Sequence, residues 1–125
     1  KLGNTSTFRD YTFVQDLAKI VNMLILSKKN LLGQTINIGT NKTHKIIDIV
    51  KTVNNITKSK KKVVIDNLRI RPKKAEVDLL RCDNSKLIKI IGKFKFTTFR
   101  DGLKKTINWK KDNDLNSLKN TNYFI

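Results

Sequence analysis

Four segments of the chain place apolar residues every three or four positions, which is the spacing of one face of an α-helix. The spacing predicts helices near residues 13–26, 43–53, 83–91 and 98–109. The apolar positions are Phe13, Leu17, Ile20, Val21, Leu24 and Ile25, then Ile46, Ile47, Ile49, Val50 and Val53, then Leu87, Ile88, Ile90 and Ile91, and finally Phe99, Leu103, Ile107 and Trp109. The predicted N-caps are Asp16, Thr43, Asp83 and Thr98, and Gly92 is expected to end the third helix.

Two short runs between the helices have strand character, at 34–39 and 62–66. The predicted order is therefore α, β, α, β, loop, α, α, which makes the chain a small α/β unit. Two short strands need further partners to form a stable sheet. Residues 111–125 are rich in Asn, Lys and Asp and show no periodicity, so we expect one domain portion over 1–110 and a tail over 111–125.

The chain of 125 residues is strongly basic, with a net charge of +17 and a pI near 10.2. Lysines that neutralise phosphates release counter-ions, so a nucleic-acid surface is one interpretation. Only five of the 27 basic residues are arginines, however, and aromatic residues make up 7% of the chain. Base readout prefers arginine and base stacking needs exposed aromatic rings. The composition therefore favours a solvated lysine surface, with a nucleic-acid-binding module as the alternative.

Neither a disulfide nor a membrane segment is expected. Cys82 is the only cysteine, and no apolar run approaches the ~18 residues of a membrane span. No signal peptide opens the chain, so we expect a cytoplasmic protein. His44, the only histidine, is expected at a helix start with no second ligand nearby, so no metal site is predicted.

The clearest candidate chemistry lies around Pro72, the only proline. Arg69 and Arg71 precede it, and Glu76 follows shortly after. The planar guanidinium matches the geometry of a phosphate, and proline fixes the backbone beside it. Arg9 lies far earlier in the chain, where folding can bring it to the same ligand. We interpret these residues as half of a nucleotide-sugar site.

Four stretches in order resemble the C-terminal part of the extended short-chain dehydrogenase/reductases, above all the NAD-dependent nucleotide-sugar 4,6-dehydratases and epimerases. Residues 9–16 read RDYTFVQD, similar to an Arg-Asp-aromatic motif that leads into a helix. Residues 33–39 read GQTINIG, similar to a strand with Asn, an apolar residue and Gly. Residues 69–86 resemble the substrate loop and its following helix, and residues 102–109 resemble the closing helix.

The resemblance implies a substrate-binding C-terminal portion whose Rossmann half is absent from this chain. In the family, that half binds NAD and carries the catalytic Tyr-x-x-x-Lys, so we expect no catalytic residue and no bound NAD here. Arg9 and Arg71 would contact the nucleotide diphosphate, and Glu76 would accept hydrogen bonds from ribose hydroxyls. The expected partners are a nucleotide-diphosphate sugar and the missing half, and the full-length enzyme is expected to be a homodimer.

The resemblance favours a 4,6-dehydratase, with a 4-epimerase of the same family as the alternative. Three residues separate Pro72 from Glu76, a longer spacing than in GDP-mannose dehydratases. This spacing is closer to dehydratases that act on nucleotide-linked N-acetylglucosamine. The chain also lacks the proline that the family usually has after the position of Gly92.

Overall fold

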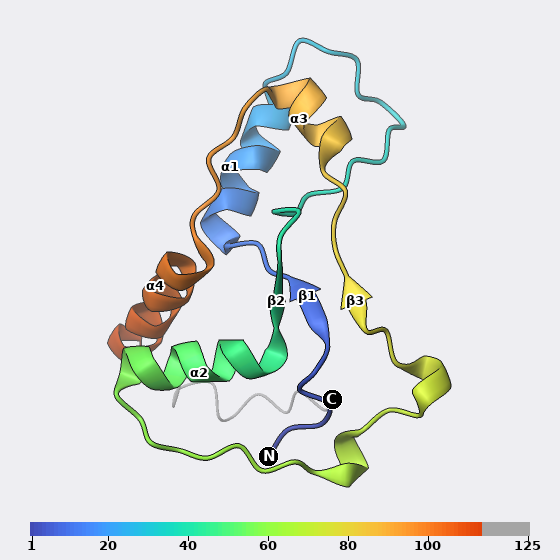
Figure 1. The fold of residues 1–125 in the computed structure, drawn as a ribbon. Helices are drawn as coiled ribbons and strands as arrows, with labels where there is room; N and C mark the ends of the chain where they lie inside the picture. The colour runs from blue at the N-terminus through green and yellow to red at the C-terminus, as the bar shows by residue number, and fades with distance from the viewer. Residues whose placement is uncertain (114–125) are drawn as a thin grey trace, which may run out of the picture.

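Three short strands form a small sheet in the middle of the molecule (Figure 1). The structure is a computed structural model and describes residues 1–113, apart from the side chain of Lys73. The central strand is β1 (Phe8–Asp10). It pairs with β2 (Thr43–Lys45) in antiparallel and with β3 (Leu79–Leu80) in parallel orientation, so the strand order is β2-β1-β3.

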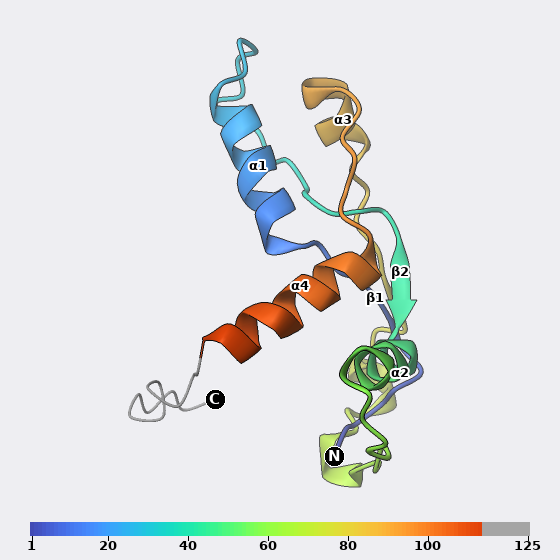
Figure 2. The same cartoon turned by 90° about the vertical axis from the view of Figure 1, so that its left-hand side faces the viewer.

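Helices flank this sheet at both ends. The elements are α1 (Val14–Ile25), α2 (Ile46–Thr57), the 3-10 turns η1 (Asn67–Arg69) and η2 (Lys73–Ala75), α3 (Ser85–Ile91) and α4 (Phe99–Asp112). α1 packs against α3 at one end of the molecule, and α2 contacts α4 at the other (Figures 1 and 2). The predicted α/β class is confirmed.

Neither predicted strand forms as expected. Residues 34–39 lie outside the sheet, and residues 62–66 contribute a single bridge between Leu2 and Ile65. β1 comes instead from a segment for which no element was predicted, β2 from a predicted helix start, and β3 from a predicted loop. A strand is stabilised by its ladder of backbone hydrogen bonds, so side-chain pattern alone does not decide which segments pair.

Three of the four predicted N-caps are wrong, because Asn84 and not Asp83 is the N-cap of α3. Asp16 lies within the first turn of α1, whose N-cap is Phe13. Its carboxylate is 2% exposed and accepts hydrogen bonds from the backbone N–H and the hydroxyl of Thr97, at 2.6 and 2.9 Å. Thr43 belongs to β2, and Lys45 is the N-cap of α2. Asp16 therefore joins α1 to the segment before α4, which pattern along the chain does not reveal.

The start of α4 and the end of α3 agree with the predictions. Thr98 caps α4, because its hydroxyl oxygen accepts a hydrogen bond from the backbone N–H of Asp101 at 3.2 Å. Gly92 ends α3 with a φ of 80°. Asp83 accepts from the backbone N–H of Ser85 at 2.9 Å, although Asn84 holds the N-cap position.

α4 continues through Asp112, two residues into the predicted tail. Residues 114–125 lie outside the described residues. The division of the chain at residue 110 stays a prediction.

The described part of the chain has a small interior. In residues 1–113, Ile20 and Leu87 are the only buried apolar side chains, each with 0% exposure. Trp109, predicted on a buried face, is 57% exposed, and Leu68 is 97% exposed. Much apolar surface is therefore available for contact with another part of a protein.

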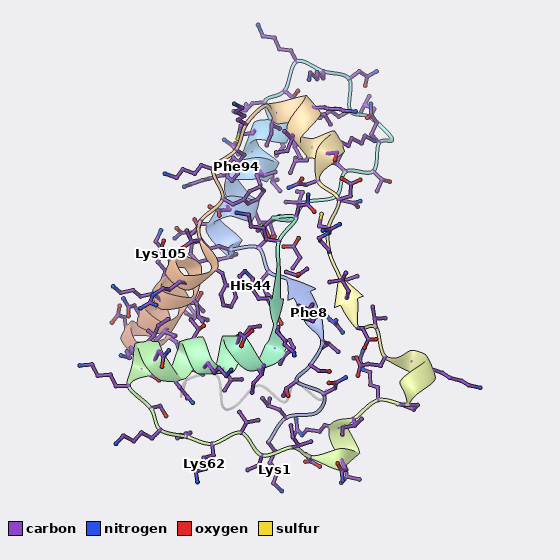
Figure 3. The ribbon with its side chains drawn as sticks, viewed as in Figure 1. Lys1, Phe8, His44, Lys62, Phe94 and Lys105 are labelled. Atoms are coloured by element: carbon purple, nitrogen blue, oxygen red, sulfur yellow. The ribbon has the colours of Figure 1, made fainter. Side chains whose placement is uncertain are left out.

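Lysines occupy the outer surface. Apart from Lys45, every lysine whose side chain the structure describes is exposed, and Figure 3 shows Lys62 on the outer edge of the chain. Two lysines also contact aromatic rings. Nζ of Lys45 lies 5.7 Å from the centre of the Phe8 ring, and Nζ of the exposed Lys105 lies 5.5 Å from the centre of the Phe13 ring.

Candidate functional site

A cleft of about 320 Å³ contains all of the predicted binding residues. Its walls come from the N-terminal segment, β1, the first residue of α2 and the segment 69–76. The lining side chains that carry charge are Arg9, Arg69, Arg71 and Glu76, and Tyr11 adds an aromatic ring. Arg9 and Arg71, far apart in sequence, therefore face one cavity.

The pairing of β1 with β3 explains why these segments meet. Phe8 lies opposite Leu79, and its backbone N–H donates to the carbonyl of Asp78 at 2.7 Å. This pairing holds the chain that follows Glu76 against the strand that carries Arg9.

A second close approach holds Arg69 beside the N-terminal segment. A Cβ added to Gly3 would lie 2.2 Å from the carbonyl oxygen of Arg69. Only a residue without a side chain allows the two backbones to come this close. Gly3 thus helps to form the cleft, which sequence reasoning missed.

Arg9 and Glu76 form an ion pair within the cleft. Nη2 of Arg9 lies 3.6 Å from Oε1 of Glu76, and the two side chains are 21% and 13% exposed. Nη1 of Arg9 also donates to the carbonyl of Phe8 at 2.8 Å. These two contacts fix the direction of the Arg9 guanidinium.

The other two arginines of the cleft are more exposed. Arg69 pairs with Asp66, with Nε 3.6 Å from Oδ2. Arg71 makes no ion pair within residues 1–113. The Arg71 guanidinium is therefore the cation that an entering anion can reach without displacing a counter-ion from this part of the chain.

Asp10 holds the end of β1 beside the cleft. Its carboxylate accepts hydrogen bonds from the backbone N–H and the hydroxyl of Thr40, from the N–H of Asn41 and from the N–H of Cys82. Two segments distant in sequence, at residues 40–41 and at Cys82, thereby converge on the Asp10 side chain. This role of Asp10 was not predicted from the sequence.

Cys82 is packed against Gly39. A Cβ on Gly39 would lie 2.2 Å from the Cβ of Cys82. Burial, followed by the negative charges of Asp10 and Asp83, raises the pKa of the Cys82 thiol. A raised pKa disfavours the reactive thiolate.

His44 lies in β2 rather than at a helix start, which corrects its predicted place (Figure 3). Its ring stacks on Phe99 with centroids 4.1 Å apart. Tyr11 lies 5.9 Å from the same Phe99 ring, so an aromatic group adjoins the cleft. Within residues 1–113, no group of three or more metal-ligating side chains is present.

Three guanidinium groups line the cleft, those of Arg9, Arg69 and Arg71. Guanidinium groups stay protonated and carry charge rather than transfer protons. Tyr11 is followed four residues later by Gln15, so the Tyr-x-x-x-Lys pattern is absent from this position. The five glycines are spread over residues 3, 33, 39, 92 and 102, which does not fit the clustered glycines of a dinucleotide-binding loop.

The family described as GDP-mannose 4,6 dehydratase matches residues 1–106. A dTDP-glucose 4,6-dehydratase of Escherichia coli is 32% identical over 119 residues, which cover 89% of this chain and 32% of that protein. A trifunctional UDP-glucose 4,6-dehydratase, epimerase and reductase of Arabidopsis thaliana is 30% identical over 111 residues, or 89% of this chain and 16% of that protein. The chain thus spans a third or less of these relatives.

Solved structures agree in fold. The UDP-glucuronic acid 4-epimerase of Bacillus cereus, solved with UDP-glucuronic acid and NAD, matches with a TM-score of 0.74 at 25% identity, over 89% of this chain and 34% of that one. An epimerase from Burkholderia cenocepacia matches with a TM-score of 0.80 at 22% identity, over 90% of this chain and 36% of that one.

The small α/β fold corresponds to part of a nucleotide-sugar dehydratase or epimerase of the extended short-chain dehydrogenase/reductase type. The chain belongs to the GDP-mannose 4,6-dehydratase family. The family and fold inferred from the sequence are both confirmed. In residues 1–113, no helix combines the length and the apolar content that crossing a bilayer requires.

Proposed function

We propose that this chain is the nucleotide-sugar-binding C-terminal part of an NAD-dependent nucleotide-sugar 4,6-dehydratase. Its role is to hold the nucleotide diphosphate, which positions the sugar for reaction in the complete enzyme. NAD, bound by an N-terminal Rossmann half, would supply hydride transfer. The chain alone would bind substrate without converting it.

The meeting of Arg9 and Arg71 in one cleft carries this proposal. The two cations come from distant segments, and a diphosphate offers two anionic groups that a pair of guanidiniums can hold. A hydrogen bond to a charged group contributes about 1.5–3 kcal/mol. The exposure of Arg71 places its contribution near the lower value, which corresponds to roughly a tenfold change in affinity.

The exposed apolar surface supports an N-terminal half as the partner. Val14 is 67% exposed, Ile25 74% and Trp109 57%. Covering such side chains is favourable by about 25 cal/mol per Å² of apolar area. We expect the full-length enzyme to dimerise through the N-terminal half rather than through the arginine cleft.

A 4-epimerase is the second candidate, because the Bacillus cereus structure with the same fold is a UDP-glucuronic acid 4-epimerase. The two reactions give different products from a nucleotide-linked sugar. A complete dehydratase releases a 4-keto-6-deoxy sugar nucleotide, whereas a complete epimerase releases the C4 epimer. Product analysis of the full-length enzyme by NMR distinguishes them.

Calorimetric titration of the 125-residue chain with UDP, GDP and dTDP tests the binding role. Arg71→Ala should weaken binding of the preferred nucleotide about tenfold, because the exposed cation is lost. Arg100→Ala is the matched control, since it removes an exposed arginine on α4 that does not line the cleft. Unchanged affinity in both Arg71→Ala and Arg9→Ala would contradict the proposal.

A further inference from the structure

Glu76 places a negative charge inside a cleft that otherwise carries three positive ones. It is the one carboxylate among the residues that line this cleft. Its side chain is 13% exposed, less than the 21% of its partner Arg9. A carboxylate so placed repels the phosphate groups of an entering ligand, so its presence in an anion-binding cleft needs a physical reason.

The geometry of the ion pair between Arg9 and Glu76 gives a physical reason for this carboxylate. The separation of 3.6 Å between Nη2 of Arg9 and Oε1 of Glu76 exceeds the roughly 2.7–3.2 Å of a hydrogen bond. The attraction is therefore mainly coulombic, and the pair is loose enough for an anion to compete for the same N–H groups. The carbonyl of Phe8 holds the other side of the guanidinium at 2.8 Å.

The two phosphate-binding candidates are consequently unequal in their access to an anion. Arg9 has a carboxylate beside it, whereas Arg71 has none within the described residues. An anion can meet Arg71 directly, but it must share or displace the Glu76 charge to meet Arg9. Only a ligand that makes additional contacts in the cleft offsets the free energy needed to displace or share the Glu76 charge.

We propose that Glu76 is a positioning residue that acts through Arg9. It orients the Arg9 guanidinium and offsets its charge, and so it disfavours small free anions relative to nucleotide-linked sugars. This inference rests on the proposed function, because it assumes that the cleft receives a diphosphate. It differs from a direct contact between Glu76 and ribose, which would act on the nucleoside and not on the anion.

Pyrophosphate and UDP, titrated in parallel by calorimetry at fixed ionic strength, separate the two roles. Pyrophosphate carries the diphosphate charge without a ribose. Glu76→Gln should bind pyrophosphate about three- to tenfold tighter than the unmodified chain, since a partly exposed charge is removed from the cleft. The same substitution in an Arg9→Ala background should produce no such gain.

Two control variants complete the set. Asp48→Asn removes an exposed carboxylate from another ion pair, with Lys51 at 3.5 Å, outside the cleft. It should leave pyrophosphate affinity unchanged, which excludes an effect of net charge alone. Glu76→Asp keeps the charge and should retain the weak pyrophosphate binding of the unmodified chain. Two-dimensional amide NMR spectra confirm that each variant keeps its fold.

The outcomes are distinct. A gain in pyrophosphate affinity that disappears without Arg9 supports the positioning role. Loss of UDP affinity with unchanged pyrophosphate affinity would overturn it in favour of a ribose contact, and an equal gain with and without Arg9 would also overturn it. If the folded, unmodified chain binds neither ligand, the proposed function itself fails and this inference fails with it.

Discussion

Replacing Asp10 by Asn tests whether one carboxylate holds the end of β1 against two other segments. Oδ1 accepts from Thr40 N and Oγ1 at 3.1 and 2.5 Å, and Oδ2 accepts from the N–H groups of Asn41 and Cys82 at 2.8 and 3.3 Å. Asparagine keeps one acceptor oxygen and turns an NH₂ group toward the two backbone N–H groups. Each charge-assisted hydrogen bond contributes about 1.5–3 kcal/mol. Allowing for the long bond to Cys82, we expect a loss of about 2–4 kcal/mol in the free energy of unfolding.

Urea unfolding followed by far-ultraviolet circular dichroism measures this loss. Asp48→Asn is the control, because its exposed pair with Lys51 should contribute only about 0–1 kcal/mol. Hydrogen exchange adds a local measurement, since the amides of Asn41 and Cys82 should exchange faster in Asp10→Asn. A loss no greater than that of the control, with unchanged exchange at both amides, would refute the role assigned to Asp10.

Two further predictions concern stability. Gly39→Ala should lower the free energy of unfolding by about 1–3 kcal/mol, because the new Cβ would lie 2.2 Å from the Cβ of Cys82; urea unfolding measures the loss, and an unchanged midpoint would disprove the close contact. Hydrogen bonds from the hydroxyl and N–H of Ser85 lower the pKa of Asp83 below its ordinary 3.8. Their stabilisation is therefore fully present above that value and lost as the pH falls through the lower folded-state pKa. The difference in Tm between the unmodified chain and Asp83→Asn should be present near pH 7 and shrink as the pH falls below 3.8, and a difference that grows in acid would contradict this reasoning.

The sequence indicated which residues line the cleft, but it did not indicate the contacts that those residues make with one another. Arg9, Arg71 and Glu76 were recognisable from residue type and family resemblance, and all three line one cavity. The ion pair between Arg9 and Glu76 was not predictable in the same way. It depends on the parallel pairing of β1 with β3, and a strand of two residues is too short to show a periodic pattern.

The helices were more accurately predicted than the strands for a related reason. A helix forms its backbone hydrogen bonds within one segment, so its apolar spacing and end residues carry most of the information. Thr98 and Gly92 illustrate this at the ends of α4 and α3. Asp16 and Thr43 show where prediction of helix ends fails. Both residues contact segments distant in sequence instead of capping a helix.

The unpaired segment 34–39 and the exposed apolar side chains have a common physical cause. Residues 34–39 have the composition of a strand, yet they join no ladder in residues 1–113. Only their ends are fixed, because Lys86 donates to the carbonyl of Thr35 and Asn84 donates to the carbonyl of Gly39, both at 2.8 Å. Buried backbone groups need hydrogen-bond partners. The chain spans about a third of its Escherichia coli relative, and under the proposed function the N-terminal half would supply both a strand neighbour for residues 34–39 and a cover for the apolar surface.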